Sequence, residues 1–416
     1  MKKFFGIILA AAVMISAFSS CAGGNTADVT VAESTPENAE VKQFKTSDYV
    51  LSSDYNYSIG EKDMYSTLLF SKDRYIYSNS NGIYVKKDLR NGGKKISKRH
   101  PRTDWSNGAV LSNGKTVYYL IVKEGTDSSF EYEVYSVDID GKNEKKELGG
   151  IGPATLITIY NGYLYFRNSP DTSAEKDTSI MRYKLGSKKD PELMSLDYQV
   201  NYTCFYNGRI YFSNDKFSSP ESLENKKARY DVYALDLDTD EIEKAVDYSY
   251  GESIAAADSK DAAFYSRKVG EKGKICIIND ENEITESKRF KAKVDPWFVD
   301  KNSEYAVMCD FNKNTREVFL KYNIKTSQHK VLSKSLKNYS CEKITSGLKP
   351  TDNVYIALSA EGKKAYSKIA VQKIQGDKAY TLKFGGKNYV DADTFWITDD
   401  KLVVEVNTKM KVYNLK

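Results

Sequence analysis

The sequence predicts an all-β fold, a β-propeller built from four-stranded antiparallel blades. Two observations lead to this fold: one segment recurs at a fixed offset, and each copy is flanked by short runs of alternating apolar and polar residues. The chain shows no capped segment with apolar residues at helical spacing. At 416 residues, it is also longer than one small hydrophobic core usually spans.

The repeat is clearest in the middle of the chain. Tyr160–Asn168 reads Tyr-Asn-Gly-Tyr-Leu-Tyr-Phe-Arg-Asn, and 46 residues later Tyr206–Asn214 reads Tyr-Asn-Gly-Arg-Ile-Tyr-Phe-Ser-Asn. Asn-Gly between two apolar runs is the strongest short-range hairpin signal. Weaker copies on both sides give eight equivalent positions, on average about 47 residues apart. These positions are Tyr77, Tyr119, Phe166, Phe212, Tyr265, Val307, Ile356 and Val404.

Each repeat continues with a second alternating strand, such as Glu133–Asp138 or Asp231–Asp236. A polar turn and a short strand such as Lys146–Leu148 close the unit, which makes four strands with the one before the hairpin turn. Such units stack radially because one small sheet cannot bury both of its faces alone. Residues 45–416 hold eight units of this length, so we predict eight blades, with seven as the alternative.

The two ends of the repeat region are incomplete. The last unit offers three strands, Thr394–Ile397, Leu402–Val406 and Met410–Leu415, and the first full unit begins near Ser66–Phe70. We predict that the surplus segment 49–57 is an N-terminal strand that supplies the missing outer strand of the last unit. This pairing would close the ring and remove an open sheet edge.

The first residues read as a bacterial secretory signal that stops at a cysteine. Lys2 and Lys3 precede an apolar run from Phe4 to Ala17 that is too short for a stable membrane span. The following Phe-Ser-Ser-Cys ends at Cys21 and resembles the lipobox of bacterial lipoproteins, with Phe where the motif usually has Leu. The resemblance implies a diacylglyceryl group on the thiol of Cys21 and cleavage just before it. The alternative is an ordinary secreted protein in which this cysteine is incidental.

Three regions follow from these patterns: a lipoprotein signal peptide at 1–20, a flexible tether at 21–45 and the propeller at 46–416. The tether is rich in small and polar residues and cannot bury enough apolar surface to order itself. Its root-mean-square reach is about 25–30 Å. We therefore expect an extracytoplasmic protein, held at the bacterial cell membrane through the lipid on Cys21.

The repeated Asn-Gly-x-Ile/Leu-Tyr-Phe-x-Asn, followed by a Tyr-containing strand and an Asp-x-Asp-Gly-type turn, resembles a family of bacterial lipoprotein-associated propellers. That family is related to the YWTD-type propellers of low-density-lipoprotein receptors. The resemblance covers most of residues 66–416 and is clearest from 105 to 250. It implies the architecture and the location at the cell surface, and it implies no substrate.

Charge and hydropathy limit the classes of partner. The formal net charge is +5 and falls to +3 when Lys2 and Lys3 leave with the signal peptide. Acidic and basic residues are interspersed along the chain, so no nucleic-acid footprint is expected. No later apolar run reaches the ~20 residues of a membrane span. We expect a monomer that contacts the membrane through Cys21 and can bind a protein or a glycan.

The residues offer little catalytic chemistry. Only His100 and His329 are present, and there is no Gly-x-Ser-x-Gly elbow, P-loop or dinucleotide-binding glycine motif. We therefore predict no catalytic residue, metal site or cofactor, and we leave enzymatic activity uncertain. Glycoside hydrolysis needs only two carboxylates at a fixed separation, so this reaction class stays an alternative.

Two acidic segments resemble the start of calcium loops, Asp236–Glu241 and Asp138–Asn143. Both fall where a hairpin must turn, and Asp, Asn and Gly are favoured there for backbone reasons. They also lack Gly at the sixth and Glu at the twelfth position of an EF-hand loop. We interpret them as turns.

The remaining cysteines and the tyrosines allow more than one role. We interpret the four cysteines as small buried apolar residues, with structural disulfides as the alternative; they are Cys204, Cys276, Cys309 and Cys341. The 32 tyrosines suit the space between sheets, or, on an exposed face, the stacking of sugars and peptide side chains. Insertions at Lys123–Phe130, Ser169–Thr178 and Lys216–Ala228 are expected on the propeller faces, where insertions in repeats often bind ligands.

The sequence thus predicts a binding module for a glycan, a peptide or an envelope protein, with the ligand-binding residues unidentified. The alternative is an extracytoplasmic enzyme that acts on polysaccharide through paired carboxylates.

Overall fold

The computed structural model describes a chain of antiparallel sheets and, within the described residues, no helix. The described residues are 54–56, 66–71, 73–79, 81–90, 92–101, 110–124, 130–168, 178–195, 198, 200–214, 231–246, 251–256, 262–266, 274–279, 281–288, 294–300, 304–310, 316–348, 352–362, 366–398, 400–407 and 409–415. The predicted all-β class is confirmed. The signal peptide, Cys21 and the tether lie outside these residues, as do nearly all of the three insertions.

The strands of the first four sheets follow one another along the chain. The first sheet holds β1 (Asp54–Asn56), β2 (Ser66–Ser71), β3 (Arg74–Asn79), β4 (Gly82–Lys86) and β5 (Lys94–Lys95). The second holds β6 (Val110–Ser112), β7 (Thr116–Glu124), β8 (Phe130–Asp138) and β9 (Lys145–Ile151). The third holds β10 (Ala154–Tyr160), β11 (Tyr163–Asn168), β12 (Ser179–Lys184) and β13 (Glu192–Leu193). The fourth holds β14 (Val200–Tyr206), β15 (Arg209–Asn214), β16 (Asp231–Asp236) and β17 (Ile242–Val246).

The same order continues to the C-terminus. The fifth sheet holds β18 (Gly251–Ala256), β19 (Ala262–Ser266), β20 (Lys274–Ile278) and β21 (Ile284–Glu286). The sixth holds β22 (Val294–Val299), β23 (Tyr305–Asp310), β24 (Val318–Asn323) and β25 (His329–Lys334). The seventh holds β26 (Ser340–Thr345), β27 (Val354–Glu361), β28 (Ser367–Gln375), β29 (Lys378–Thr381) and β30 (Val390–Ala392). The eighth holds β31 (Thr394–Thr398), β32 (Lys401–Val406) and β33 (Lys409–Asn414).

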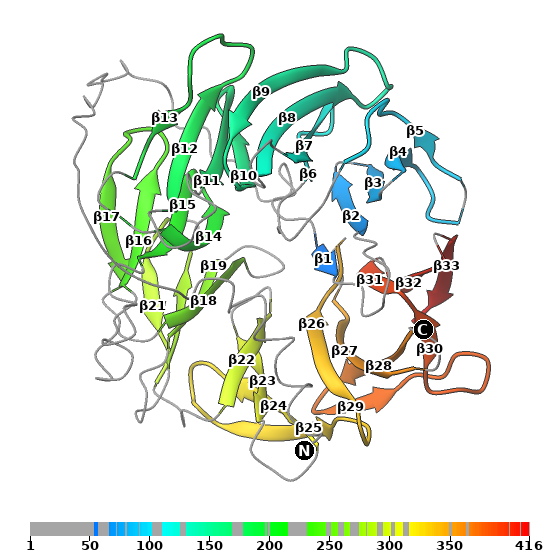
Figure 1. Ribbon diagram of the computed structural model, residues 1–416. Coiled ribbons are helices and arrows are strands. Elements are labelled where there is room, and N and C mark those ends of the chain that lie inside the picture. Colours follow the sequence, from blue (N-terminus) through cyan, green and yellow to red (C-terminus); the bar gives the residue numbers. More distant parts are fainter. Residues whose placement is uncertain are drawn as a thin grey trace, which may run out of the picture.

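The sheets are arranged radially around a common centre, which is the arrangement of a β-propeller (Figure 1). In most sheets the strands run outward in chain order, so the inner edge is formed by strands such as β10, β14, β22 and β26. The eight equivalent positions read from the sequence each lie in a different sheet. Seven of them lie on the second strand of their sheet, and Tyr77 lies on β3, the third strand of the first sheet, which has the additional strand β1 at its start. The predicted repeat is therefore confirmed at the level of single strands.

The Asn-Gly turns have the geometry that the hairpin prediction requires. Asn161 and Gly162 have φ of 46° and 79°, and Asn207 and Gly208 have 46° and 75°. Positive φ at both central residues belongs to the type I′ turn, whose twist matches that of the two flanking strands. An Asn-Gly pair adopts this conformation at low steric cost because glycine has no Cβ and asparagine tolerates it better than most residues.

Hydrophobic side chains fill the space between neighbouring sheets. Within the described residues, eight buried clusters each join two sheets: the first to the second, the second to the third, and so on to the seventh and eighth. The eighth cluster joins the last sheet to the first, with Trp396 and Val403 packed against Leu68, Tyr75 and Tyr77. Packing on both faces is what a small four-stranded sheet needs, because it cannot bury both faces by itself.

The first and last sheets meet differently from our expectation. β1 pairs antiparallel with β2, with Tyr55 opposite Thr67, and it does not supply an outer strand to the last sheet. That part of the prediction is wrong. Strand β33 is instead the outer edge of a three-stranded sheet, and it carries the exposed Lys409 and Lys411. Lysines on an edge strand discourage pairing with another chain, so this edge does not need a further strand.

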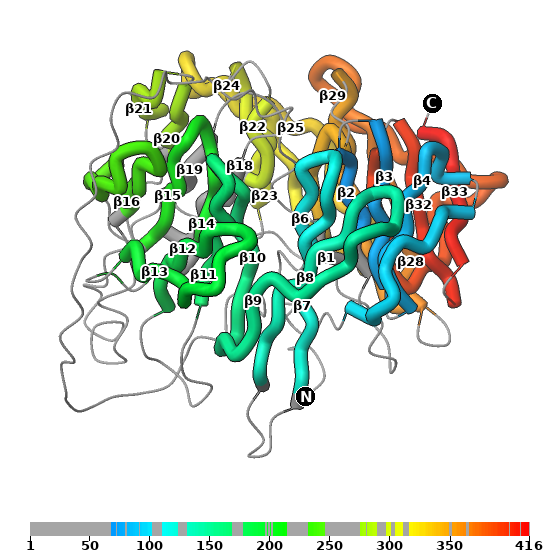
Figure 2. Tube along the Cα trace, turned by 90° about the horizontal axis from the view of Figure 1, so that it is seen from above, coloured from blue at the N-terminus to red at the C-terminus, as the bar shows by residue number. Residues whose placement is uncertain are grey.

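The chain connections distribute over two faces of the ring. In the second, third and fourth sheets, two or three residues join the first strand to the second, and longer connections, at residues 125–129, 169–178 and 215–230, join the second strand to the third. In Figure 2 the ends of β7 and β8 that flank residues 125–129 reach the lower edge, whereas the tip between β28 and β29 lies at the upper edge. We call the face on which residues 125–129 connect β7 to β8 the long-connection face. No helix in the described part of the chain has the length and apolar character needed to cross a membrane.

Candidate functional site

The inner wall of the ring is irregular at the same place in five consecutive sheets. The third to seventh sheets each carry a bulge on their first strand, between Leu156 and Thr158, Val200 and Thr203, Gly251 and Ser253, Pro296 and Phe298, and Cys341 and Lys343. A bulge adds a residue to one strand and redirects its side chain, and bulges are frequent beside functional sites.

Two of the bulged positions carry side chains suited to ligand binding. Trp297 is the extra residue of β22, and Glu342, 45 residues later, is the extra residue of β26, the neighbouring inner strand. Trp297 is half-buried and packs against the hydrophobic cluster that contains Cys341. Glu342 is exposed and directly follows Cys341. An aromatic ring thus packs against the cluster that contains Cys341, and a carboxylate directly follows Cys341 on β26.

A second carboxylate reaches the same stretch from the sixth sheet. Glu317, the residue before β24, accepts a hydrogen bond from the backbone N–H of Cys341 to Oε2 at 2.6 Å. Its own N–H donates to Ser335 Oγ at 3.0 Å, which holds the start of β24 against the end of β25. Glu342 accepts a hydrogen bond from the hydroxyl of Ser359 on β27. We call Trp297, Glu317 and Glu342 the inner-wall site.

The protein around the inner-wall site favours the protonated form of both carboxyl groups. Burial, together with the nearby Glu342, raises the pKa of Glu317 to about 7, although the hydrogen bond from Cys341 opposes the rise. Burial also raises the pKa of Glu342, although part of its side chain reaches solvent, because the surrounding sheets exclude much of the water. No described lysine or arginine contributes to either shift. A carboxyl group that titrates near neutrality can donate or accept a proton under physiological conditions.

The site lies at the long-connection face. Glu317 follows the connection between the second and third strands of the sixth sheet, and Glu342 lies near the beginning of a first strand. In an antiparallel sheet these two chain positions are at the same end. The three insertions lie in the second, third and fourth sheets, and each of them also falls between the second and the third strand of its sheet. The structure therefore assigns the inner-wall site and the attachment points of the insertions to one face.

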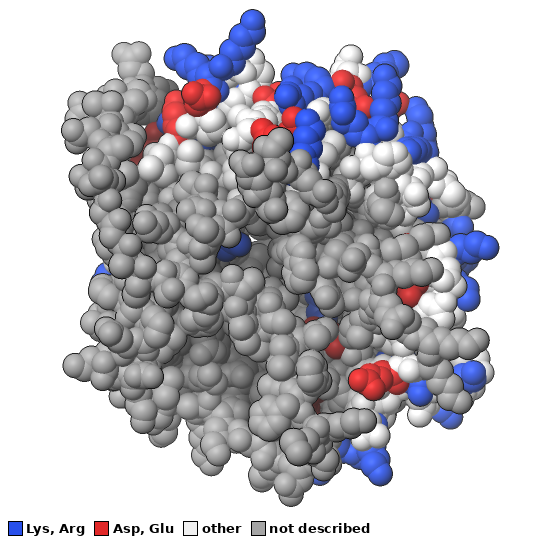
Figure 3. Space-filling model, viewed as in Figure 1, with Lys and Arg blue, Asp and Glu red and all other residues white. Residues whose placement is uncertain are grey.

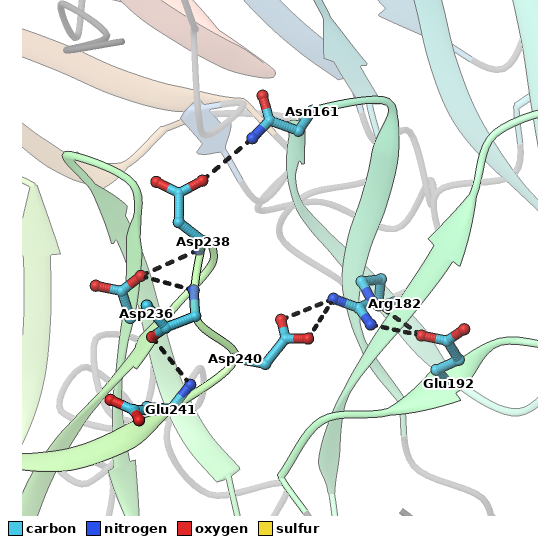
Figure 4. Close-up of polar contacts among 8 residues, drawn as sticks. Asn161, Arg182, Glu192, Asp236, Asp238, Asp240 and Glu241 are labelled. Atoms are coloured by element: carbon cyan, nitrogen blue, oxygen red, sulfur yellow. Dashed lines mark hydrogen bonds and ion pairs between the residues drawn. The ribbon is translucent and has the colours of Figure 1, made fainter. Parts of the chain in front are cut away.

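The calcium-like segment Asp236–Glu241 forms the turn between β16 and β17, as we interpreted it. Asp236 Oδ1 accepts the backbone N–H groups of Asp238 and Thr239 at 3.0 and 3.2 Å. The other two aspartates point away to the third sheet (Figure 4). Asp238 accepts the Tyr160 hydroxyl at 2.8 Å, and Asp240 accepts two bonds from Arg182 at 2.7 and 2.9 Å. These carboxylates shape the turn and join two sheets.

The second such segment, Asp138–Asn143, forms the turn between β8 and β9. Asp138 accepts the Thr116 hydroxyl at 3.1 Å and the Asn143 amide at 2.7 Å, and Asp140 accepts the N–H of Lys142 at 3.0 Å. Asn143 and Gly141 both have positive φ, as expected for Asn and Gly in a turn. Across the described residues, no group of three or more His, Cys, Asp and Glu is arranged to hold a metal ion.

The four cysteines are buried, and no disulfide joins any two of them. This agrees with our interpretation of them as small core residues. Cys204 and Cys276 lie in the cluster between the fourth and fifth sheets, and Cys309 and Cys341 in that between the sixth and seventh. Burial raises the pKa of the Cys204 thiol to about 12, which keeps it protonated and unreactive at neutral pH.

The described tyrosines mostly pack between sheets, and many of their hydroxyls reach a polar group of the next sheet. Tyr160 donates to Asp238 at 2.8 Å and Tyr355 to Asp400 at 2.6 Å. Within the described residues, Tyr380 is the tyrosine with a largely exposed side chain, 51 %. The packing role expected for these residues is confirmed.

Sequence reasoning missed all three residues of the inner-wall site. Trp297 and Glu342 are separated by nearly one repeat, so aligning the repeats on their first strands would have placed them at equivalent positions. Glu317 carries no such signal, because its proximity to Cys341 depends on how the sixth and seventh sheets pack. Cys21, the predicted lipidation site, lies outside the described residues.

Comparison with known proteins identifies no family. No family model matches this sequence, and no curated protein matches it. Among solved structures, the chain is similar to prolyl oligopeptidase B from Galerina marginata, with 14 % identity over 82 % of this chain and 53 % of that one, at a TM-score of 0.47. It is also similar to a puromycin-hydrolysing peptidase of Mycobacterium tuberculosis, with 11 % identity over 74 % of this chain and 51 % of that one, at a TM-score of 0.43.

A third similarity is to TolB from Acinetobacter baumannii, with 12 % identity over 76 % of this chain and 79 % of that one, at a TM-score of 0.34. The chain thus spans about half the length of the two peptidases.

Proposed function

We propose that this protein is a membrane-anchored, extracytoplasmic β-propeller that acts as a binding module for a glycan, a peptide or an envelope protein. The sequence supports the anchor through the basic, apolar and lipobox-like segments that end at Cys21. The eight inter-sheet clusters, the last of which joins the eighth sheet to the first, support a closed ring of eight blades. The YWTD-like repeat supports the same architecture and the location at the cell surface.

One observation carries the binding proposal: Glu317 and Glu342 meet at Cys341 on the long-connection face, and Trp297 packs against the cluster that contains Cys341. The face of an indole ring stacks on the apolar face of a sugar, and carboxylates accept hydrogen bonds from its hydroxyl groups. This combination favours a neutral or amino-sugar glycan over an acidic ligand. A peptide with a basic or aromatic side chain is the other ligand that the same groups fit.

Replacing Cys21 by serine is expected to move the protein from the membrane fraction to the soluble fraction. Serine cannot form the thioether that carries the acyl chains, and each buried CH₂ group of those chains contributes about 0.8 kcal/mol to membrane binding. The measurement is fractionation of cells that express the full chain, with Ser34→Ala as a control inside the predicted tether. Equal membrane retention of Cys21→Ser and the parent chain would contradict the anchor.

Trp297→Ala is expected to weaken glycan binding by about tenfold, because the stacking surface is lost. Glu342→Gln keeps the shape of the side chain and should weaken binding through the altered hydrogen bonds. Binding is measured on an array of cell-envelope glycans and by calorimetry with the best ligand. Tyr380→Ala, which removes an exposed aromatic ring on the outer strand β29, is the matched control. Ligand binding that is equally strong in all variants would exclude the inner-wall site.

The raised pKa of Glu317 favours a second candidate function, hydrolysis of a polysaccharide. A glycosidase needs one carboxylic acid to protonate the leaving oxygen and one carboxylate as base or nucleophile. Glu317 and Glu342 would take these two roles. Release of reducing ends from envelope polysaccharide by the parent chain, and its loss in Glu317→Gln, would select this function over binding alone.

A further inference from the structure

The outer part of the eighth, first and second sheets presents a strongly basic surface. Within residues 86–99, 140–147 and 409–414, eleven basic side chains are exposed, against two exposed acids, Asp88 and Asp140. We call these basic side chains the basic rim; they are Lys87, Arg90, Lys94, Lys95, Lys98, Arg99, Lys142, Lys145, Lys146, Lys409 and Lys411. Figure 3 shows basic side chains along the upper and right-hand margin, over the region of β9, β4, β5 and β33.

Contacts between the three sheets make the basic rim continuous. Lys94 Nζ donates to the carbonyl oxygen of Asp140 at 2.6 Å, which joins β5 to the turn before β9. On the other side, Arg90 donates to Asn414 Oδ1 at 3.4 Å, which joins the loop after β4 to the end of β33. The three stretches of sequence, two of them more than 300 residues apart, therefore form one surface.

Several charges of the basic rim are not neutralised within the protein. Lys145 and Lys146 pair with Glu147 and Glu133. In contrast, no described carboxylate forms an ion pair with Lys87, Lys95 or Lys98, and all three side chains are exposed. An excess of one sign over neighbouring strands creates a potential that attracts a partner of the opposite sign.

We propose that the basic rim binds an anionic phospholipid surface and so orients the propeller on it. The idea rests on the proposed function, because the lipid on Cys21 would hold the domain within reach of the membrane. The predicted tether leads to β1, and β1 pairs with β2 in the first sheet. Strand β5 of this sheet and the segments beside it carry six of the eleven residues of the basic rim. The tether would therefore leave the domain from the sheet that faces the lipid headgroups.

The energetics suit a weak, reversible contact. Each lysine or arginine close to an anionic membrane strengthens binding by a factor of about five, and the effect fades within a Debye length of about 10 Å. A tether with a reach of about 30 Å keeps the domain at a high effective concentration near the surface. A modest electrostatic attraction is then enough to hold one orientation and to direct the inner-wall site relative to the membrane.

The test uses the mature chain without its anchor, residues 21–416 with Cys21→Ser, and measures sedimentation with phospholipid vesicles. We expect binding to mixed phosphatidylcholine–phosphatidylglycerol vesicles and none to pure phosphatidylcholine. Binding should disappear when NaCl rises from about 0.05 to about 0.5 M, because salt screens exposed charges. The triple variant Lys87→Glu, Lys95→Glu and Lys98→Glu should lose affinity by about 100-fold or more.

The matched control changes three exposed lysines of the sixth and seventh sheets, Lys325→Glu, Lys337→Glu and Lys378→Glu. It alters the net charge equally and should keep most of the vesicle binding. Equal loss in both triple variants would overturn the proposal, since net charge and not the rim would then matter. So would failure of the parent chain to bind anionic vesicles, or its preference for a soluble polyanion such as heparin. These outcomes leave the anchor untouched, which is tested separately in cells by Cys21→Ser.

Discussion

Trp396→Ala is expected to lower the free energy of unfolding of the whole domain by about 3–5 kcal/mol, the usual cost of removing a buried tryptophan side chain. Trp396 is 1 % exposed and lies on β31, in the cluster that joins the last sheet to the first. Its ring meets that of Tyr77 edge to face, with centroids 6.1 Å apart. Truncation leaves a cavity between the two sheets that come from opposite ends of the chain.

Urea unfolding followed by circular dichroism measures the effect. Trp396→Phe should cost less, because a ring still fills part of the space, and Tyr380→Ala should change stability by less than about 0.5 kcal/mol because its side chain is exposed. If the first and last sheets complete a ring, Trp396→Ala should also make the C-terminal strands more sensitive to limited proteolysis. A variant as stable as the parent would contradict both the buried position and the closed ring.

Domain stability is expected to decrease between about pH 5 and about pH 7 because of Glu317. The pKa of this group is raised from 4.5 to about 7 in the folded state. Between these two values the folded protein binds more protons than the unfolded chain, so the free energy of unfolding falls as pH rises, and it levels off above the folded pKa. A pKa difference of this size corresponds to at most about 3 kcal/mol. Glu342 adds an effect of the same sign, because burial raises its pKa as well.

Glu317→Gln should remove most of this slope and stabilise the domain at about pH 8, where the parent must bury a charged carboxylate. The measurement is urea unfolding of both proteins across the pH range, with the exposed Glu281→Gln as control. An unchanged slope in Glu317→Gln, or stability that rises with pH in the parent, would refute the assignment. The same variant serves the hydrolysis assay, so a loss of activity can be compared with the change in folding stability.

Much of the fold could be predicted from local patterns. Strand alternation and Asn-Gly turns are properties of a few neighbouring residues, and the type I′ turns at Asn161 and Asn207 follow from the backbone preferences of Asn and Gly. The period of the repeat placed Phe166 and six of its equivalents on the second strand of a sheet, and Tyr77 on β3 of the first sheet. Asp236–Glu241 was recognisable as a turn for the same local reason.

The pairing of segment 49–57 and the inner-wall site depend on contacts between residues far apart in the chain. The edge of β33 was expected to require another strand, but Lys409 and Lys411 protect an edge equally well, and β1 pairs with β2. Similarly, Glu317 and Cys341 meet because two sheets pack face to face. A bulge at Glu342 shifts its neighbours by one residue, and the sequence does not mark such a shift.

The basic rim depends partly on a local sequence pattern and partly on contacts between distant segments. The seven basic residues and one acid between 86 and 99 are visible in the sequence, although the chain as a whole is nearly balanced in charge. They form one surface with Lys142 and Lys411 only because the eighth, first and second sheets lie beside one another. A charged segment becomes a surface only when packing decides which other segments lie beside it.

By itself, the sequence determined the all-β class, the repeated four-stranded unit and its hairpin turns, because these depend on side-chain alternation and on backbone preferences over a few residues. Only the tertiary structure decided how the first and last sheets meet, which carboxylates share a low-dielectric environment and which lysines form one surface. The reason is physical: inter-sheet packing, desolvation and summed electrostatic potential act between groups that are close in space, and distance along the chain does not predict that closeness.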